Sequence, residues 1–106
     1  MMKGRSVTKA DKKLHNDLVN IVGCIACLLD GRINNYVLIH HIDGRTKKGA
    51  HQNVLPLCAG HHQHGTGAPG LIAVHPYKAQ FEARYGKQED LLIECHRIIN
   101  LQKSVA

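Results

Sequence analysis

The chain has 106 residues and fits a single domain. It is 43% hydrophobic, but one Phe, three Tyr and no Trp leave an aliphatic core that would be marginal without a supplement such as a structural metal. No apolar run approaches the roughly 20 residues of a membrane helix, and the N-terminus lacks the apolar segment of a signal peptide. We therefore expect a reducing compartment, in which the four cysteines are metal ligands rather than disulfides.

The formal net charge is +6, and lysines and arginines lie at both ends and in the middle of the chain. Such an excess attracts phosphate-bearing partners. Many small proteins are basic for solubility alone, so charge by itself leaves nucleic-acid binding open.

The N-terminal third predicts one helix and one cysteine-bearing turn. Residues 1–7 are polar and are expected to fray. Apolar periodicity predicts a helix over residues 8–20, with Thr8 as its N-cap. The segment VGCIACLLDG then places Cys24 and Cys27 in a tight knuckle.

The middle of the chain predicts two strands and a short helix. NYVLIHHI is β-rich and predicts a strand that ends near His41. The following DGR is either a two-residue hairpin turn or the start of a longer basic loop, DGRTKKGAHQ. NVLPLC predicts a returning strand, which Pro56 restricts to a sheet edge or an irregular strand. AGHHQHG predicts a short helix that ends at Gly65 and Gly67.

Two further helices are predicted after the linker APGLIAVHPY. Pro76 suits the first turn of a helix running to Tyr85, and Gly86 suits its C-terminal cap. KQEDLLIECHRIINLQK predicts the last helix. Its apolar face is formed by Leu91, Leu92, Cys95, Ile98 and Ile99.

Cysteine spacing predicts a structural zinc site. Cys24-x-x-Cys27 and Cys58-x-x-His61 form two pairs separated by thirty residues. Each pair can bind a metal from one tight turn, and tetrahedral zinc accepts a Cys₃His set.

Two other uses of these cysteines fit poorly. A DNA-reading zinc finger could take His40 as its third ligand, but positions 44–46 hold no histidine for the fourth. A thioredoxin-like redox pair should follow a strand, whereas here a helix precedes the knuckle. Cys95 lies on an apolar helix face and is expected in the core.

The remaining histidines form a second pattern. His40 and His41 are adjacent on the predicted strand, so they point to opposite faces. One can bind a metal while the other faces a substrate. A single surface histidine is usually only solvated, but His41, Asn53 and His62 together match a known constellation, with nine residues from Asn53 to His62.

That constellation resembles the HNH, or ββα-metal, nuclease motif. The resemblance implies that His41 is the general base and that His40 and His62 bind a catalytic divalent ion. Asn53 would hold the loop and orient the base through hydrogen bonds. Phosphodiester hydrolysis suits these residue types, because a neutral histidine can take a proton from water and a hard divalent ion can stabilise charge on the phosphate.

The third ligand of the catalytic ion is less clear in the sequence. The further helix ligand of colicin-type enzymes would fall at Thr66, and threonine is a poor substitute. His64, His75 or water could fill the position. We take His75, because Pro76 fixes its backbone.

The segments HHIDGR, NVLPLCAGHHQHG and HPYKAQFEARYG narrow the match. Together they resemble the phage recombination-enhancement (Ref) nuclease family. The resemblance implies a zinc-bearing HNH domain that cuts DNA with help from a RecA-type recombinase filament, in the cytoplasm of a bacterial host. Residues 1–106 would form a single HNH nuclease domain, with a motif-bearing core over roughly 20–86 and a C-terminal helix over 87–103.

The sequence thus predicts a small zinc-stabilised α+β domain with a ββα-metal core and flanking helices. Its function would be a DNA endonuclease dependent on Mg²⁺, Mn²⁺ or Zn²⁺, in addition to the structural zinc. Arg45, Lys47 and Lys48 would grip DNA phosphates without reading sequence, or would form only a solvated loop tip.

Two points stay open at this level. A non-catalytic zinc module that binds nucleic acid would keep the Cys₃His site and leave His41 without a role. His61, His62 and His64 could also exchange ligand roles, because all three closely follow Cys58.

Overall fold

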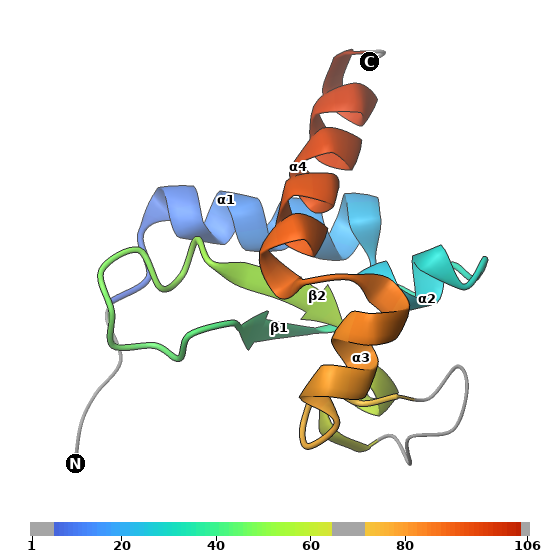
Figure 1. The fold of residues 1–106 in the computed structure, drawn as a ribbon. Helices are drawn as coiled ribbons and strands as arrows, with labels where there is room; N and C mark the ends of the chain where they lie inside the picture. Colours follow the sequence, from blue (N-terminus) through green and yellow to red (C-terminus); the bar gives the residue numbers. More distant parts are fainter. Residues whose placement is uncertain (1–5, 65–71, 105–106) are drawn as a thin grey trace.

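The computed structural model describes residues 6–64 and 72–104, except for the side chain of His64 (Figure 1). Its elements in chain order are α1 (Lys9–Asp17), the π-helical turn η1 (Leu18–Val22), α2 (Ile25–Leu29), β1 (Leu38–His41), β2 (Val54–Leu57), the π-helical turn η2 (Gly60–His64), α3 (Lys78–Tyr85) and α4 (Gln88–Ser104). The predicted α+β class is confirmed. Over the described residues, no helix has both the length and the apolarity needed to cross a bilayer.

The first helix begins where the sequence predicts. The Thr8 hydroxyl accepts a hydrogen bond from the Asp11 N–H (3.1 Å), and the Asp11 carboxylate accepts one from the Thr8 N–H (3.0 Å). This reciprocal capping box satisfies N–H groups that a helix start leaves unpaired. η1 continues α1 without a break and buries Leu18 and Val22.

A two-stranded antiparallel sheet lies at the centre of the fold (Figure 1). Its register pairs Ile39 with Pro56, and His41 with Val54. Every residue of β2 is buried. Within the described part of the chain β2 pairs only with β1, so Pro56 stands in a strand with a sheet partner on one side, as predicted. The connection between the strands is the longer basic loop, residues 42–53, and not a two-residue turn.

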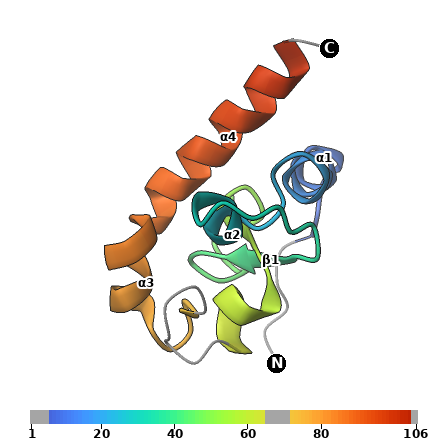
Figure 2. The same ribbon diagram turned by 90° about the vertical axis from the view of Figure 1, so that its right-hand side faces the viewer.

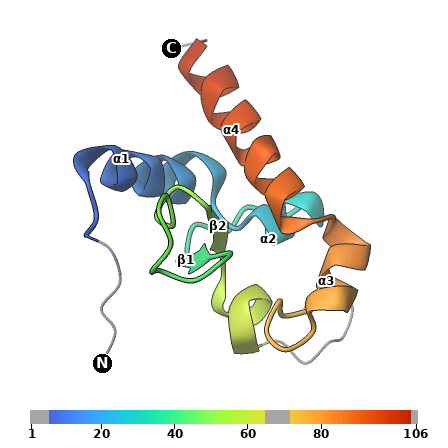
Figure 3. The same ribbon diagram turned by 60° about the vertical axis from the view of Figure 1, so that its left-hand side comes forward.

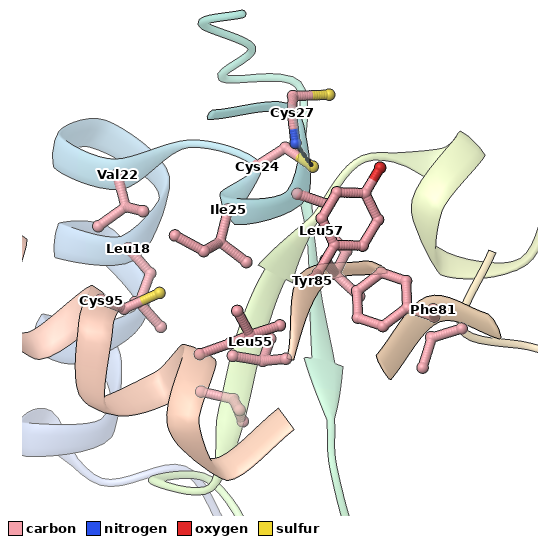
Figure 4. Packing of buried hydrophobic residues seen from close by; sticks show 14 of the residues in the cluster. Leu18, Val22, Cys24, Ile25, Cys27, Leu55, Leu57, Phe81, Tyr85 and Cys95 are labelled. Atoms are coloured by element: carbon pink, nitrogen blue, oxygen red, sulfur yellow. Dashed lines mark hydrogen bonds between the residues drawn. The ribbon is translucent and has the colours of Figure 1, made fainter. Parts of the chain in front are cut away.

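Helices on several sides close the core over β2. α4 packs against η1 and β2, and α2 packs against β2. Figure 4 shows Leu18, Ile25, Leu55 and Cys95 converging from four different elements. Cys95 is fully buried, which confirms its predicted place in the core.

The two C-terminal helices differ slightly from the prediction. α3 begins at Lys78, with Tyr77 as its N-cap, so Pro76 lies in the preceding turn and not in the first turn of the helix. Gly86 caps its end with a φ of 109°, as predicted. α4 runs diagonally away from α3 and extends beyond the rest of the fold (Figure 2).

Gly23 shapes the cysteine knuckle between η1 and α2. It has φ 70° and ψ −159°, a backbone conformation open essentially to glycine alone. A Cβ atom at this position would lie 2.6 Å from the backbone oxygen of Asn34. That oxygen accepts a hydrogen bond from the Cys24 N–H (2.7 Å). The loop before β1 thus approaches the knuckle too closely for any side chain at Gly23.

Gly23→Ala is expected to lower the free energy of unfolding by about 1–3 kcal/mol, through backbone strain and the clash with Asn34. Urea unfolding of the zinc-loaded chain measures the loss. Gly31→Ala is the matched control, because Gly31 also has a positive φ (84°) but has no atom within 4 Å of an added Cβ. Equal losses in the two variants would show that the close approach to Asn34 has no energetic weight.

Candidate metal centres and active site

Three cysteines and a histidine meet at one end of the sheet. Cys24 is the N-cap of α2 and Cys27 lies in its first turn. Cys58 follows β2 directly, and His61 lies in η2. Their ligand atoms all lie within 4.8 Å of one another. The backbone N–H groups of His61 and His62 both bond to the Cys58 carbonyl (3.1 and 2.9 Å), which forms the turn between the second pair of ligands.

The spacing of these atoms fits a tetrahedral metal. With Zn–S bonds of about 2.3 Å and a Zn–N bond of about 2.0–2.1 Å, tetrahedral ligands lie about 3.8 Å (S···S) and about 3.6 Å (S···N) apart. The Cys27 and Cys58 sulfurs are 3.8 Å apart. The three sulfurs lie 3.5, 3.5 and 3.2 Å from His61 Nδ1. The cluster could therefore hold a structural metal such as zinc.

The surroundings of the cluster also suit a cation. Burial raises the pKa of the Cys24 thiol to about 12. A thiolate would therefore form there only with the compensating charge of a bound ion. The Cys27 N–H lies 3.4 Å from the Cys24 sulfur, and Asn34 Nδ2 lies 3.9 Å from the Cys27 sulfur. Such donors stabilise sulfur that carries negative charge.

A chain of hydrogen bonds orients His61. The Tyr85 hydroxyl donates to Asp30 Oδ2 (2.6 Å), so its oxygen is left to accept from His61 Nε2–H (3.1 Å). Asp30 is also held by Arg84 (2.9 Å). This arrangement leaves the His61 Nδ1 lone pair for the metal, as outer partners of histidine ligands commonly do. The sequence marks Tyr85 only as the end of a predicted helix.

A second cluster gathers His40, His62 and His75, whose ligand atoms also lie within 4.8 Å of one another. Their ring centroids are 5.1 Å (His40–His62), 5.1 Å (His40–His75) and 5.5 Å (His62–His75) apart. His40 comes from β1 and His62 from η2. His75 reaches them because its N–H bonds to the His62 carbonyl (3.0 Å).

The two clusters divide the ligand candidates. His61 lies with the cysteines and His62 with the other histidines. The side chain of His64 and all of Thr66 lie outside the described residues.

Gln88, the first residue of α4, orients His40. Its Nε2 faces the Glu82 carboxylate (3.4 Å), so its Oε1 faces His40 Nε2 (2.7 Å) and accepts a hydrogen bond from it. The His40 Nδ1 lone pair remains for a metal. Burial lowers the pKa of His40 to about 4, so this ligand is neutral near pH 7. Gln88 is buried but carries no sequence pattern that marks it.

His41 lies on the other face of β1, as strand geometry requires. It lines a pocket of about 360 Å³ together with His15, Arg45, His51 and His62, among others. Burial and then the positive charge of Arg45 lower its pKa, which favours the neutral form. Arg45, Lys47 and Lys48 are all exposed on the loop of residues 42–53.

Asn53 holds that loop closed. Its Nδ2 donates to Asp43 Oδ2 (2.8 Å), and its carbonyl accepts from the Ile42 N–H (3.0 Å). The side chain that contacts His41 is instead His51, with His41 Nε2 and His51 Nδ1 2.9 Å apart. Sequence reasoning missed His51, because it lies in the loop rather than in the strand and helix that carry the motif.

Comparison with protein families supplies the context for these clusters. Residues 7–100 match the family described as recombination enhancement, RecA-dependent nuclease. The chain belongs to this family. The resemblance stated from the sequence is thereby confirmed, and the family sets the chain in a context of DNA cleavage and RecA. The matched region includes both clusters and His41.

Cys27→Ala is expected to abolish stoichiometric zinc binding and cooperative unfolding, because structural zinc contributes directly to folding free energy. Zinc content per chain and a thermal melt measure both effects. Cys95→Ala serves as control, since it removes a buried thiol that is outside the cluster, and it should keep the zinc. A stable, zinc-loaded Cys27→Ala chain would contradict the assignment.

Tyr85→Phe is expected to weaken zinc binding by about 10- to 100-fold, because it removes the hydroxyl that orients His61. Competition with a chromophoric chelator measures the affinity. Tyr36→Phe is the control, because Tyr36 is 91% exposed. An unchanged zinc affinity in Tyr85→Phe would show that the hydrogen bond to His61 does not act on the metal.

Proposed function

We propose that this member of the RecA-dependent nuclease family is a divalent-metal-dependent DNA endonuclease of the ββα-metal (HNH) type. The contrast between its two clusters carries the proposal. Three of the four ligands of the Cys₃His group are buried, and the set is complete for a structural metal. The histidine cluster has three ligands whose exposure rises from His40 through His62 to His75, which is the pattern of a catalytic site with an open position.

The order of elements supports the HNH assignment. His40 and His41 end the first strand, Asn53 directly precedes the second, and His62 lies in the helical turn after it. One strand end therefore supplies a metal ligand on one face and a base on the other. This is the arrangement of strand, strand and helix that gives the ββα-metal motif its name.

In the proposed reaction, His41 accepts a proton from the water that attacks the phosphodiester. Its lowered pKa keeps it neutral near pH 7, as a general base must be. His40, His62 and His75 would hold the divalent ion, which when bound stabilises charge on the phosphate and the leaving oxygen. Asn53 holds the start of the loop that follows His41, through its hydrogen bonds to Ile42 and Asp43.

The exposed loop supports a DNA substrate. Arg45 lines the pocket that also contains His41 and His62. Lys47 and Lys48 extend this positive charge along the loop between the strands. Contacts of this kind position a phosphate backbone without reading bases, so we propose cleavage with little sequence specificity. The family description supports a RecA-type filament as partner. An origin in a phage or prophage is proposed from the sequence resemblance alone.

The decisive experiment is plasmid cleavage by the zinc-loaded chain with Mg²⁺ or Mn²⁺, with and without a RecA filament. His41→Ala is expected to lower the cleavage rate by about 10²- to 10⁴-fold, the usual contribution of a general base, and to leave zinc content unchanged. His96→Ala is the control, because His96 is exposed on α4 away from both clusters.

Cleavage that survives in His41→Ala would remove His41 as the base. Absence of cleavage by the wild-type chain under all four conditions, with DNA still retained in a binding assay, would replace the nuclease with a non-catalytic zinc module that binds nucleic acid.

A further inference from the structure

We propose that the exposed lysines of α1 form a second surface for DNA phosphates beside the pocket that contains His41, in addition to the basic loop of residues 42–53. These lysines are Lys9, Lys12 and Lys13. The inference rests on the proposed function and extends its DNA contacts from the loop to the first helix. The occupant of this surface is the sugar-phosphate backbone of DNA next to the phosphate that is cleaved.

The pocket lies along one side of α1. Val7, just before the N-cap of this helix, and His15, in its last turn, both line the pocket together with His41. Lys12 is three positions before His15, and residues three apart are neighbours on a helix surface. Lys9 is three positions further on, so His15, Lys12 and Lys9 form one row. This row leads from the pocket towards the start of α1.

Two hydrogen bonds join the loop to α1, so the cations of both elements belong to one surface. The His51 carbonyl accepts a hydrogen bond from His15 Nε2 (2.7 Å), and Gln52 Nε2 donates to Asp11 Oδ1 (2.6 Å). Figure 3 shows the loop lying beside the helix. Arg45 of this loop lines the same pocket as His15. The pocket therefore has cations close to it on both elements.

The acidic residues of the two elements do not cancel this positive charge. Three carboxylates lie on α1 and the loop, and each already has a partner: Asp11 is bonded to Gln52, Asp17 to Lys103 and Asp43 to Asn53. The three lysines of α1 and the three cations of the loop form no ion pair with any described residue. Such uncompensated charge around a pocket attracts phosphates.

The length of α1 beside the pocket suits a DNA strand. From Val7 to His15 the chain covers roughly 10 Å, at about 1.5 Å per helical residue. A B-form strand advances about 3.4 Å per nucleotide, so this length corresponds to about three nucleotides. A strand with its cleaved phosphate at His41 can therefore present neighbouring phosphates to Lys12 and Lys9. Contacts of this kind position the backbone and carry no sequence information.

The test is DNA binding at several salt concentrations by the full-length, zinc-loaded chain, without Mg²⁺ or Mn²⁺, so that cleavage plays no part. The probe is a short fluorescent DNA duplex. Lys9→Gln/Lys12→Gln removes two cations of the row and keeps good helix formers. Lys78→Gln/Lys87→Gln is the matched control, because it lowers the net charge equally at exposed positions on and just after α3, which does not line the pocket. Zinc content and melting temperature check folding.

Each phosphate contact contributes about 0.9 to the slope of log K against log salt concentration. We expect Lys9→Gln/Lys12→Gln to reduce the magnitude of this slope by about two. The control should leave the slope unchanged, and Lys9→Arg/Lys12→Arg should keep it because both charges remain. In plasmid cleavage, Lys9→Gln/Lys12→Gln should raise KM for DNA and leave kcat unchanged, as the loss of uniform binding does.

An equal slope in Lys9→Gln/Lys12→Gln and in the control would overturn the inference and leave the proposed nuclease with its loop as the DNA contact. An unchanged slope together with a weaker response of cleavage to the RecA filament would assign the α1 lysines to the filament protein, which also overturns it. A wild-type chain that binds DNA through these lysines but cuts none would overturn the proposed function and leave this surface in place.

Discussion

The rest of the structure depends on the meeting of the Cys24–Cys27 knuckle with the Cys58–His61 turn. This contact joins the start of α2 to the end of β2 in a chain whose core has few large side chains. A metal there would supply the stability that such a core lacks. It also sets the geometry of the second cluster. Once His61 faces the sulfurs, its neighbour His62 lies beside His40, so the Cys₃His cluster and the three-histidine cluster meet at adjacent residues of the chain.

The helices around this centre supply side chains that hold the histidines and the loop of residues 42–53 in place. α3 supplies Tyr85, which orients His61, and the first residue of α4, Gln88, orients His40. α1 holds the loop that carries His51 through His15 and Asp11. These three helices therefore hold the hydrogen-bond partners of histidines in addition to packing on the core. Such outer partners determine which ring nitrogen is available and keep the ring in place.

Membership of the RecA-dependent nuclease family and the geometry of the histidines support the same conclusion from independent directions. The family match covers residues 7–100 of the 106-residue chain. The geometry concerns a few atoms at the end of one strand. A three-histidine set and a neutral histidine beside an exposed basic loop suit the metal-assisted phosphodiester hydrolysis that we propose, and the Cys₃His set suits a structural metal.

The sequence alone determined the features that depend on local spacing. The α1 cap at Thr8, the two strands, the apolar face of α4 and the pairing of Cys24-x-x-Cys27 with Cys58-x-x-His61 follow from periodicity and short-range ligand geometry. Local rules misplaced the start of α3, because Pro76 fits a turn as well as a first helical turn. The DGR signal also left the loop of residues 42–53 undecided until the pairing of β1 with β2 settled it.

Only the tertiary structure decided the partners of the histidines. Gln88 lies 48 positions from His40, and Tyr85 lies 24 from His61. Nothing in a local pattern marks a buried glutamine or a loop histidine such as His51, because their roles arise from contacts between distant segments that form only when the core closes. The sequence could name the imidazoles, but the packing of helices around a two-stranded sheet decided which side chain each imidazole contacts.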